Sequence, residues 1–332
     1  MTKKLKIFLN YFVGPVLFLW LSYSIYHQVK SQGDVQQSWH LIRSAFTGEQ
    51  NWKLLLALLL MPLNWGIEAE KWRFLVKDIQ KVSFFKAYRA IFAGQAIAFS
   101  MPNRVGESAG RSVYLDEGNR IRGIAQSLAG SMSQIIVTFV LGIAGLYYTR
   151  AYILDATHQL EGLSVFWLDG LIYALTTGIT LFIVVYFRIS WFVQLIEKIP
   201  IVARHRFFIE KLEGLHWKEL TKILLLSAAR YVVFVGQYVL LLQVFEVGIG
   251  FSTAIPLICV MFLVMAIIPT IALAELGFRG KVSIMLFGMM SANTLGIIAT
   301  AAGIWIINLI IPAIIGTVFI LGLRLFRNKQ TT

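Results

Sequence analysis

The sequence predicts an all-α polytopic membrane protein, with about six spanning helices and two re-entrant hairpins of broken helices arranged as an inverted repeat. Hydrophobic residues make up 58% of its 332 residues and charged residues only 14%, whereas roughly a quarter of a soluble domain is charged. Apolar runs close to the ~20 residues that cross a bilayer recur along the whole chain. Two further runs are broken by proline and followed by a Glu–Arg pair. We therefore expect residues 1–332 to form a single integral membrane domain.

The first predicted helix covers 7–26 and follows a basic tail. Its apolar run is long and no small-x-small cleavage site follows it, so we interpret it as a retained helix rather than a signal peptide. Five more spanning helices are expected at 53–70, 123–148, 167–187, 220–246 and 293–323. Basic residues gather at 71–89, in an interfacial or cytoplasmic loop at 188–219, and after 323. The positive-inside rule therefore places both termini in the cytoplasm.

Two regions, 84–115 and 252–291, do not fit as simple crossings. In the loop count, each begins and ends on one side of the membrane, which predicts a hairpin that dips in from that side. Proline cannot continue a helix and restricts the residue before it. The candidate break and hinge positions are Pro102, Gly106, Pro269 and Gly277. Non-helical backbone at this depth is tolerated only inside protein or beside a water-filled cavity.

The hairpins divide most of the chain into two pseudo-repeats, at about 53–148 and 220–323. Each consists of a helix, a hairpin and a second helix, and the loop count gives the two repeats opposite orientations in the membrane. Inverted repeats whose broken helices meet near the bilayer midplane are a recurring plan of secondary transporters, and the breaks mark the binding site. The sequence therefore predicts a site between the two hairpins.

Each hairpin carries a Glu four residues before an Arg. The pairs are Glu107 with Arg111 in "MPNRVGESAGR" and Glu275 with Arg279 in "IPTIALAELGFRG". This spacing places both side chains on one face of a short helix. One interpretation is internal neutralisation, in which each Arg only satisfies its own Glu. A charge at bilayer depth costs at least about 2.5–3.5 kcal/mol and usually marks a pathway or a site, so two pairs at corresponding breaks favour a functional role.

Further charged residues end the second helix, in "NWGIEAEKWR". Glu68 lies deepest in this segment, and we prefer it to Glu70 as a site residue. Lys71 and Arg73 are expected to extend to the cytoplasmic headgroups. Trp72 is expected in the interfacial aromatic belt.

Two arginines complete the set of charges expected within the membrane. Arg104 lies in the first break, and Arg230 lies about ten residues into the helix at 220–246, with Gln237 on the same face. The polar residues expected to hydrogen-bond between helices are Gln95, Gln134 and Asn308. The small residues expected at close helix contacts are Gly142, Gly145, Gly296 and Gly303.

The charges expected at depth leave one positive charge in excess. The positive residues are Arg104, Arg111, Arg230 and Arg279, and the negative residues are Glu68, Glu107 and Glu275. Such an excess suits a bound anion. Arginine is the natural partner of phosphate because its planar guanidinium donates two parallel hydrogen bonds.

Other chemistries find no support in the sequence. The net charge of +13 is explained by basic cytoplasmic loops, so we expect no nucleic-acid binding. The stretch "GFRGKVS" lacks the spacing of a phosphate-binding loop. The five histidines fall in loops without ligand spacing, and no Ser-His-Asp grouping is visible. We therefore expect no enzyme activity, no metal and no cofactor.

The two motifs, "FSMPNRVGESAGR" followed by a Gly/Ser-rich helix and the later "IIPTIALAELGFRG", resemble the lysylphosphatidylglycerol synthase transmembrane-region family, also called flippase-like proteins. The positions that the resemblance makes central are Pro102, Arg104, Gly106, Glu107 and Arg111 in the first hairpin, and Pro269, Glu275 and Arg279 in the second. In larger members this unit precedes a cytosolic aminoacyl-transfer domain. This chain stops at "RLFRNKQTT", so it resembles a stand-alone membrane unit, and we do not expect synthase activity.

Together, these features predict a lipid translocase that moves a phosphate-bearing polar headgroup between the leaflets of the bacterial inner membrane. The expected ligands are phospholipids or polyprenyl-phosphate-linked lipids. One alternative is a non-transporting lipid-binding partner of a separate lipid or envelope synthase, and another is a small-solute secondary transporter. A homo-oligomer is compatible with the sequence.

Overall fold

The computed structural model describes residues 23, 43, 47–99, 106–154, 164–191, 214–268 and 272–327. Within these ranges every regular element is a helix, and no strand occurs. The fold class is therefore the all-α polytopic membrane fold that the composition predicts. Apart from residue 23, the first predicted helix, 7–26, lies outside the described residues, and so does most of the predicted loop at 188–219.

Five helices of the described chain are long and apolar enough to cross a membrane. They are α4 (Asn51–Leu75), α7 (Arg120–Tyr152), α8 (Val165–Phe187), α12 (Trp217–Val244), and the joined α15 (Thr294–Trp305) and α16 (Ile311–Arg327). A π-helical turn, Ile306–Ile310, joins the last two. These helices correspond to the spans predicted from 53 onwards, with ends that differ by a few residues.

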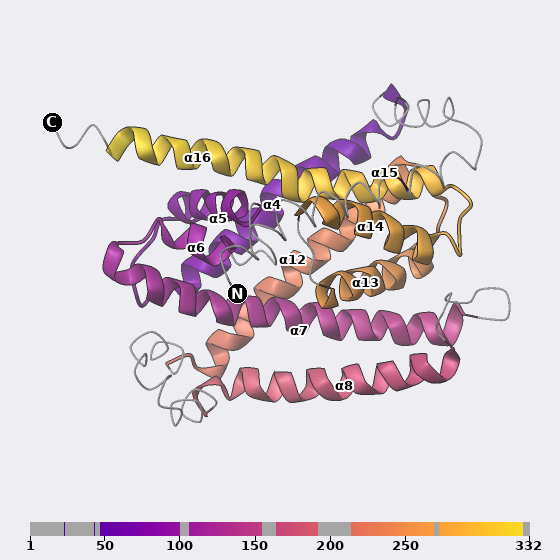
Figure 1. Ribbon diagram of the computed structural model, residues 1–332, viewed down its shortest axis with the longest axis horizontal. Coiled ribbons are helices and arrows are strands. Elements are labelled where there is room, and N and C mark those ends of the chain that lie inside the picture. Colours follow the sequence, from indigo (N-terminus) through magenta and orange to yellow (C-terminus); the bar gives the residue numbers. More distant parts are fainter. Residues whose placement is uncertain are drawn as a thin grey trace.

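Four shorter helices occupy the two regions predicted to break. They are α5 (Phe84–Phe99) with α6 (Gly106–Ser112), and α13 (Phe251–Ile267) with α14 (Ala272–Phe287). Figure 1 shows the α5–α6 pair toward one end of the molecule and the α13–α14 pair toward the other. Both pairs pack against long helices: α5 against α4 and α16, α6 and α13 against α7, and α14 against α15.

Helices of the second half of the chain pack against helices of the first half. Helix α13 of the second half packs along α7 of the first, and α16 of the second half packs along α5 of the first. At the centre, α4 and α12 pack against each other, while α8 packs mainly along α7 (Figure 1). Under the predicted pseudo-repeats α5 corresponds to α13 and α16 to α7, so these two contacts are equivalent to each other.

Glycines allow both exchanged contacts to be close. A side chain at Gly145 of α7 would come within 2.7 Å of the Pro256 carbonyl oxygen of α13, and one at Gly316 of α16 would overlap the Phe92 carbonyl of α5. A Cβ at Gly142, Gly296 or Gly303 would also press on a neighbouring segment. The close-packing role predicted for these glycines is confirmed.

Replacing Gly316 with valine should lower the thermal unfolding midpoint of the purified protein, because the α16–α5 contact has no room for a side chain. Overpacking of this kind costs about 1–3 kcal/mol. The matched control is Gly178→Ala in α8, where an added Cβ meets nothing within 4 Å. That change should leave the midpoint unchanged or raise it, since alanine favours the helix. Equal midpoints for the two variants would contradict the close crossing.

Candidate functional site

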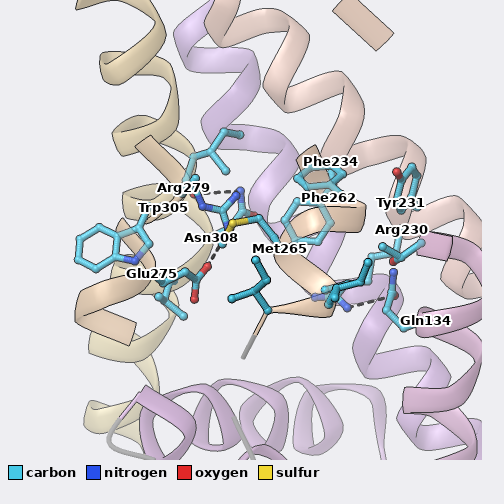
Figure 2. A pocket seen from close by; sticks show the side chains of 16 residues that line it. Gln134, Arg230, Tyr231, Phe234, Phe262, Met265, Glu275, Arg279, Trp305 and Asn308 are labelled. Atoms are coloured by element: carbon cyan, nitrogen blue, oxygen red, sulfur yellow. Dashed lines mark hydrogen bonds and ion pairs between the residues drawn. The ribbon is translucent and has the colours of Figure 1, made fainter. Parts of the chain in front are cut away.

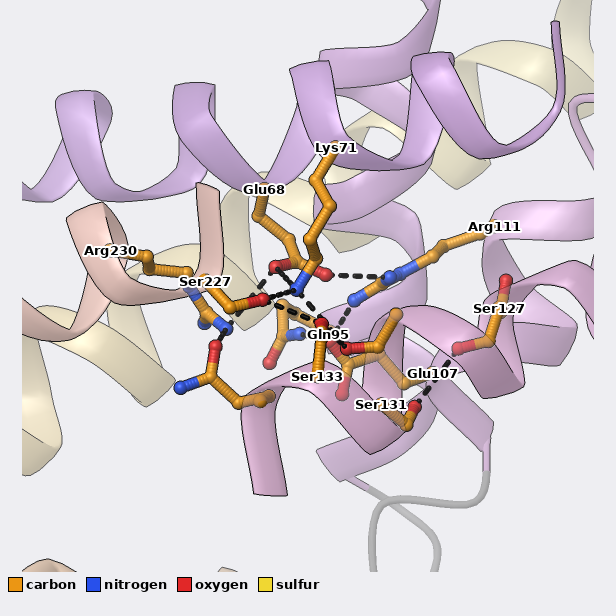
Figure 3. Close-up of polar contacts among 12 residues, drawn as sticks. Glu68, Lys71, Gln95, Glu107, Arg111, Ser127, Ser131, Ser133, Ser227 and Arg230 are labelled. Carbon is orange, nitrogen blue, oxygen red and sulfur yellow. Dashed lines mark hydrogen bonds and ion pairs between the residues drawn. The ribbon is translucent and has the colours of Figure 1, made fainter. Parts of the chain in front are cut away.

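Glu68 lies at the centre of a buried network of charges. It is 3% exposed and sits in the second half of α4. Its Oε1 is 2.8 Å from Nη1 of Arg111, and its Oε2 is 2.8 Å from Nζ of Lys71 and 3.3 Å from Nη1 of Arg230. Figure 3 shows these three cations approaching the carboxylate from different directions. Glu70, by contrast, pairs near the surface with Arg73, so Glu68 is the more deeply buried of the two, as predicted.

Lys71 belongs to this network, and its predicted extension to the headgroups is wrong. The side chain is 2% exposed, and its ammonium pairs with Glu68 and donates to Ser227 Oγ at 3.2 Å and to the Gly130 carbonyl at 3.4 Å. Three partners match the three donors of an ammonium group. Trp72, predicted in the interfacial belt, is also fully buried.

The first motif is built into the same network. In the seven-residue helix α6, Glu107 lies in the first turn and Arg111 in the last, where each charge complements the helix dipole. Arg111 bridges Glu107 and Glu68, and Gln95 of α5 donates to Glu107 Oε1 at 2.6 Å. Gly106, a predicted hinge, is buried at the first residue of α6. Arg111 therefore satisfies more than its own Glu.

Arg230 links the network to the surrounding helices. Its Nε donates to Asn64 Oδ1 at 2.9 Å and its Nη1 to Gln134 Oε1 at 3.3 Å. Its guanidinium carbon lies 4.9 Å from the Trp65 ring centroid and 5.2 Å from that of Phe234. Aromatic faces on two sides stabilise a cation that is largely removed from water.

A chain of amides continues from Arg230 toward the π-helical turn. Asn64 donates to Asn308 Oδ1 at 3.2 Å, and Asn308 donates to Gln237 Oε1 at 3.2 Å. Asn308 lies in Ile306–Ile310, and π-turns are frequent at functional sites. The predicted interhelical hydrogen bonding of Asn308 is confirmed.

The second motif lies apart from the network. Arg279 Nη2 is 2.6 Å from Glu275 Oε1 within α14, so the four-residue pairing is present here too. Gly277, predicted as a hinge, is buried inside α14. The prediction of a break at Gly277 is wrong, because the helix runs through this glycine.

A cavity of about 540 Å³ separates the second motif from Arg230. Its polar lining comes from Gln134, Arg230, Tyr231, Glu275, Arg279 and Asn308, and its larger apolar side chains are Phe234, Phe262, Met265 and Trp305. In Figure 2, Glu275 and Arg279 lie at one end, Gln134 and Arg230 at the other, and Met265 lies between them. The cavity thus brings together three of the predicted site residues, while Glu107 and Arg111 are absent from its lining.

Three predicted positions, Pro102, Arg104 and Pro269, lie outside the described residues. In the described part, four cations oppose three carboxylates. The cations are Lys71, Arg111, Arg230 and Arg279, and the carboxylates are Glu68, Glu107 and Glu275. An excess of one positive charge is present even without Arg104, because Lys71 joins the set. The signal that could have found Lys71 is its position three residues after Glu68 on the same helix face.

Among the described residues, no group of three His, Cys, Asp or Glu side chains could hold a metal ion. The polar lining of the cavity can instead offer guanidinium and amide donors to an anion, with aromatic and thioether surface beside them. This lining is complementary in charge and polarity to an anionic group attached to an apolar body.

Comparison with known protein families gives a match over nearly the whole chain. The model of the lysylphosphatidylglycerol synthase TM region matches residues 7–316. The chain belongs to this family. No curated protein matches the chain. Membership of this family indicates a function related to membrane lipids, and the matched range contains both motifs, the buried network and the cavity.

Replacing Glu68 with glutamine should strongly destabilise the protein, because three buried cations would lose the carboxylate that they share. Removing one partner of a buried ion pair costs about 3–5 kcal/mol. The control is Glu70→Gln, two residues along the same helix, whose partner Arg73 is exposed. Thermal unfolding of both variants in detergent measures the difference, and a midpoint for Glu68→Gln as high as that for Glu70→Gln would contradict the central role of Glu68.

Proposed function

We propose that this protein is a lipid translocase that moves a phosphate-bearing polar headgroup between the leaflets of the bilayer. The observation that carries the proposal is the cavity of about 540 Å³ between membrane-spanning helices, lined by Arg230 and Arg279. A polar headgroup must cross about 30 Å of hydrocarbon, and a lined cavity within the bundle replaces part of its lost hydration. Membership of a lipid-related family supports this reading.

The rim of the cavity suits a ligand with apolar tails. Ala266, Ile267 and Ile268, at the end of α13, are exposed and belong to the lining. Trp305 adds aromatic surface from the opposite helix. A headgroup held inside could therefore leave its acyl chains against the apolar rim and in the surrounding lipid.

The proposal includes a membrane orientation. We place the protein in the bacterial inner membrane, with both termini in the cytoplasm. The basic ends of α4 and α12 lie together, since Lys77 pairs with Glu219 and the ammonium groups of Lys77 and Lys222 each lie 4.3 Å from the Phe74 ring centroid. A shared basic end is the end that the positive-inside rule assigns to the cytoplasm. The two short-helix pairs would then be re-entrant hairpins that enter from opposite sides.

We propose transport or presentation of lipid without covalent chemistry, cofactor or nucleic acid. The partners would be membrane phospholipids or polyprenyl-phosphate-linked lipids, and a separate synthase could supply the lipid. A protein that only binds lipid and presents it to such a synthase would have the same cavity, so transport itself must be measured.

In proteoliposomes carrying a headgroup-labelled phospholipid, an impermeant quencher should extinguish the label faster than in vesicles without the protein. Arg279→Gln should slow this exchange by about tenfold or more, because a hydrogen bond to a charged group contributes about 1.5–3 kcal/mol. Arg73→Gln, which removes a partly exposed arginine that does not line the cavity, should leave the rate unchanged. Wild-type rates equal to those of empty vesicles across several lipid classes would favour the presentation model.

Single cysteines at the hairpin ends test the orientation, in a chain whose own Cys259 is replaced by alanine. Lys81→Cys lies between α4 and α5, and Ala292→Cys lies between α14 and α15; both positions are exposed. An impermeant thiol reagent should label position 81 only from the cytoplasmic side and position 292 only from the outer side. Labelling of both from one side would exclude the inverted arrangement.

A further inference from the structure

The two Glu–Arg pairs share a spacing but differ in their surroundings. Arg111 is held between Glu107 and Glu68, and its side chain is 8% exposed. Glu107 is also bound by Gln95. Neither Glu107 nor Arg111 lines the cavity. The first pair is therefore fixed by neighbours on other helices, so that the separation of one partner would disturb α4 as well as α6.

The second pair faces the cavity. Glu275 and Arg279 both belong to the lining, with side chains 13% and 12% exposed. Glu275 Oε1 pairs with one terminal nitrogen of Arg279. Within the described part of the chain, the buried Nε of Arg279 has no hydrogen-bond partner. A guanidinium has five donor hydrogens, so the pair with Glu275 uses only part of the donor capacity of Arg279.

The charge of the lining also indicates an anion. Arg230 and Arg279 contribute two positive charges and Glu275 contributes one negative charge, which leaves one positive charge. A phosphodiester carries a single negative charge and would balance it. Gln134 and Asn308 supply amide donors on the same lining, and arginine binds phosphate through two parallel hydrogen bonds when its fork is free.

We propose that Glu275 is a resident counter-anion, which the phosphodiester of a lipid headgroup displaces from Arg279 when the cavity fills. When no lipid is bound, the Glu275 carboxylate pairs with the Arg279 guanidinium. It therefore competes with the lipid phosphate for that guanidinium. Competition weakens binding and speeds release, because the carboxylate returns as the phosphate leaves. Glu275 thus lowers the affinity of the site for lipid and speeds the release of lipid during transport. The inference rests on the proposed function, since it assumes that a phosphate-bearing lipid is the ligand.

The test measures binding separately from transport. The purified full chain in detergent is titrated with phosphatidylglycerol, and native mass spectrometry reports the bound lipid. Glu275→Gln should bind about three- to tenfold more tightly than wild type, because the neutral amide no longer competes as an anion. Arg279→Gln should bind more weakly. Unchanged or weaker binding by Glu275→Gln, with wild type binding normally, would overturn the displacement while leaving the proposed function intact.

A double variant distinguishes the displacement of Glu275 from Arg279 from a general electrostatic effect of removing the Glu275 charge. When Arg279→Gln is already present, Glu275→Gln should no longer tighten binding, since the two residues act through one another. Equal tightening in both backgrounds would overturn the inference. Glu107→Gln changes the charge by the same amount at the corresponding motif position, away from the cavity, and should not tighten binding.

Two further measurements complete the test. In proteoliposomes, Glu275→Gln should lower both the half-saturating lipid concentration and the maximal exchange rate, whereas a merely unfolded variant would lose rate without gaining affinity. In a parallel titration, inorganic phosphate should compete only weakly with phosphatidylglycerol. If inorganic phosphate saturates the protein and phosphatidylglycerol does not bind, the ligand is free phosphate. That result would contradict the proposed function as well.

Discussion

The structure depends on one buried carboxylate that serves three cations. Lys71, Arg111 and Arg230 all approach Glu68 within 3.3 Å, and they come from three different helices. Burying an ion is expensive unless its charge and its hydrogen bonds are satisfied. The positions of α4, α6 and α12 are therefore coupled, because each helix contributes a charge that needs the other two. Arg230 extends this coupling to the cavity, where it forms part of the wall.

The two motif copies have the same internal geometry and different environments. The first is joined to α4 and α5, and helps to hold the bundle together. The second lines the cavity, with Glu275 and Arg279 paired within α14. The shared four-residue spacing of the two Glu–Arg pairs therefore does not oblige them to share a role. In this protein one pair belongs to the buried network and the other lines the cavity.

Much of the fold could be predicted because long apolar runs and basic loops report directly on spanning helices. The prediction failed for Lys71 and Trp72, which precede a basic stretch and were assigned to the interface for that reason. The buried Lys71 ammonium is satisfied by Ser227 and Gly130, which belong to other helices, and the sequence alone does not bring these residues together. Gly277 was assigned to a break, although a glycine inside a helix costs only about 1 kcal/mol. The cavity could not be predicted at all, since its volume depends on how five helical segments pack.

The π-helical turn at Ile306–Ile310 has a consequence for how sequences of this kind can vary in length. A π-turn accommodates one more residue than the α-helical turn that it replaces. Deleting one residue there would rotate α16 by about 100° relative to α15, and Gly316 would turn away from Phe92 of α5. A relative that lacks the extra residue would need its small residue at a shifted place in the chain. Insertions and deletions in this stretch should therefore occur only together with a compensating move of the glycine.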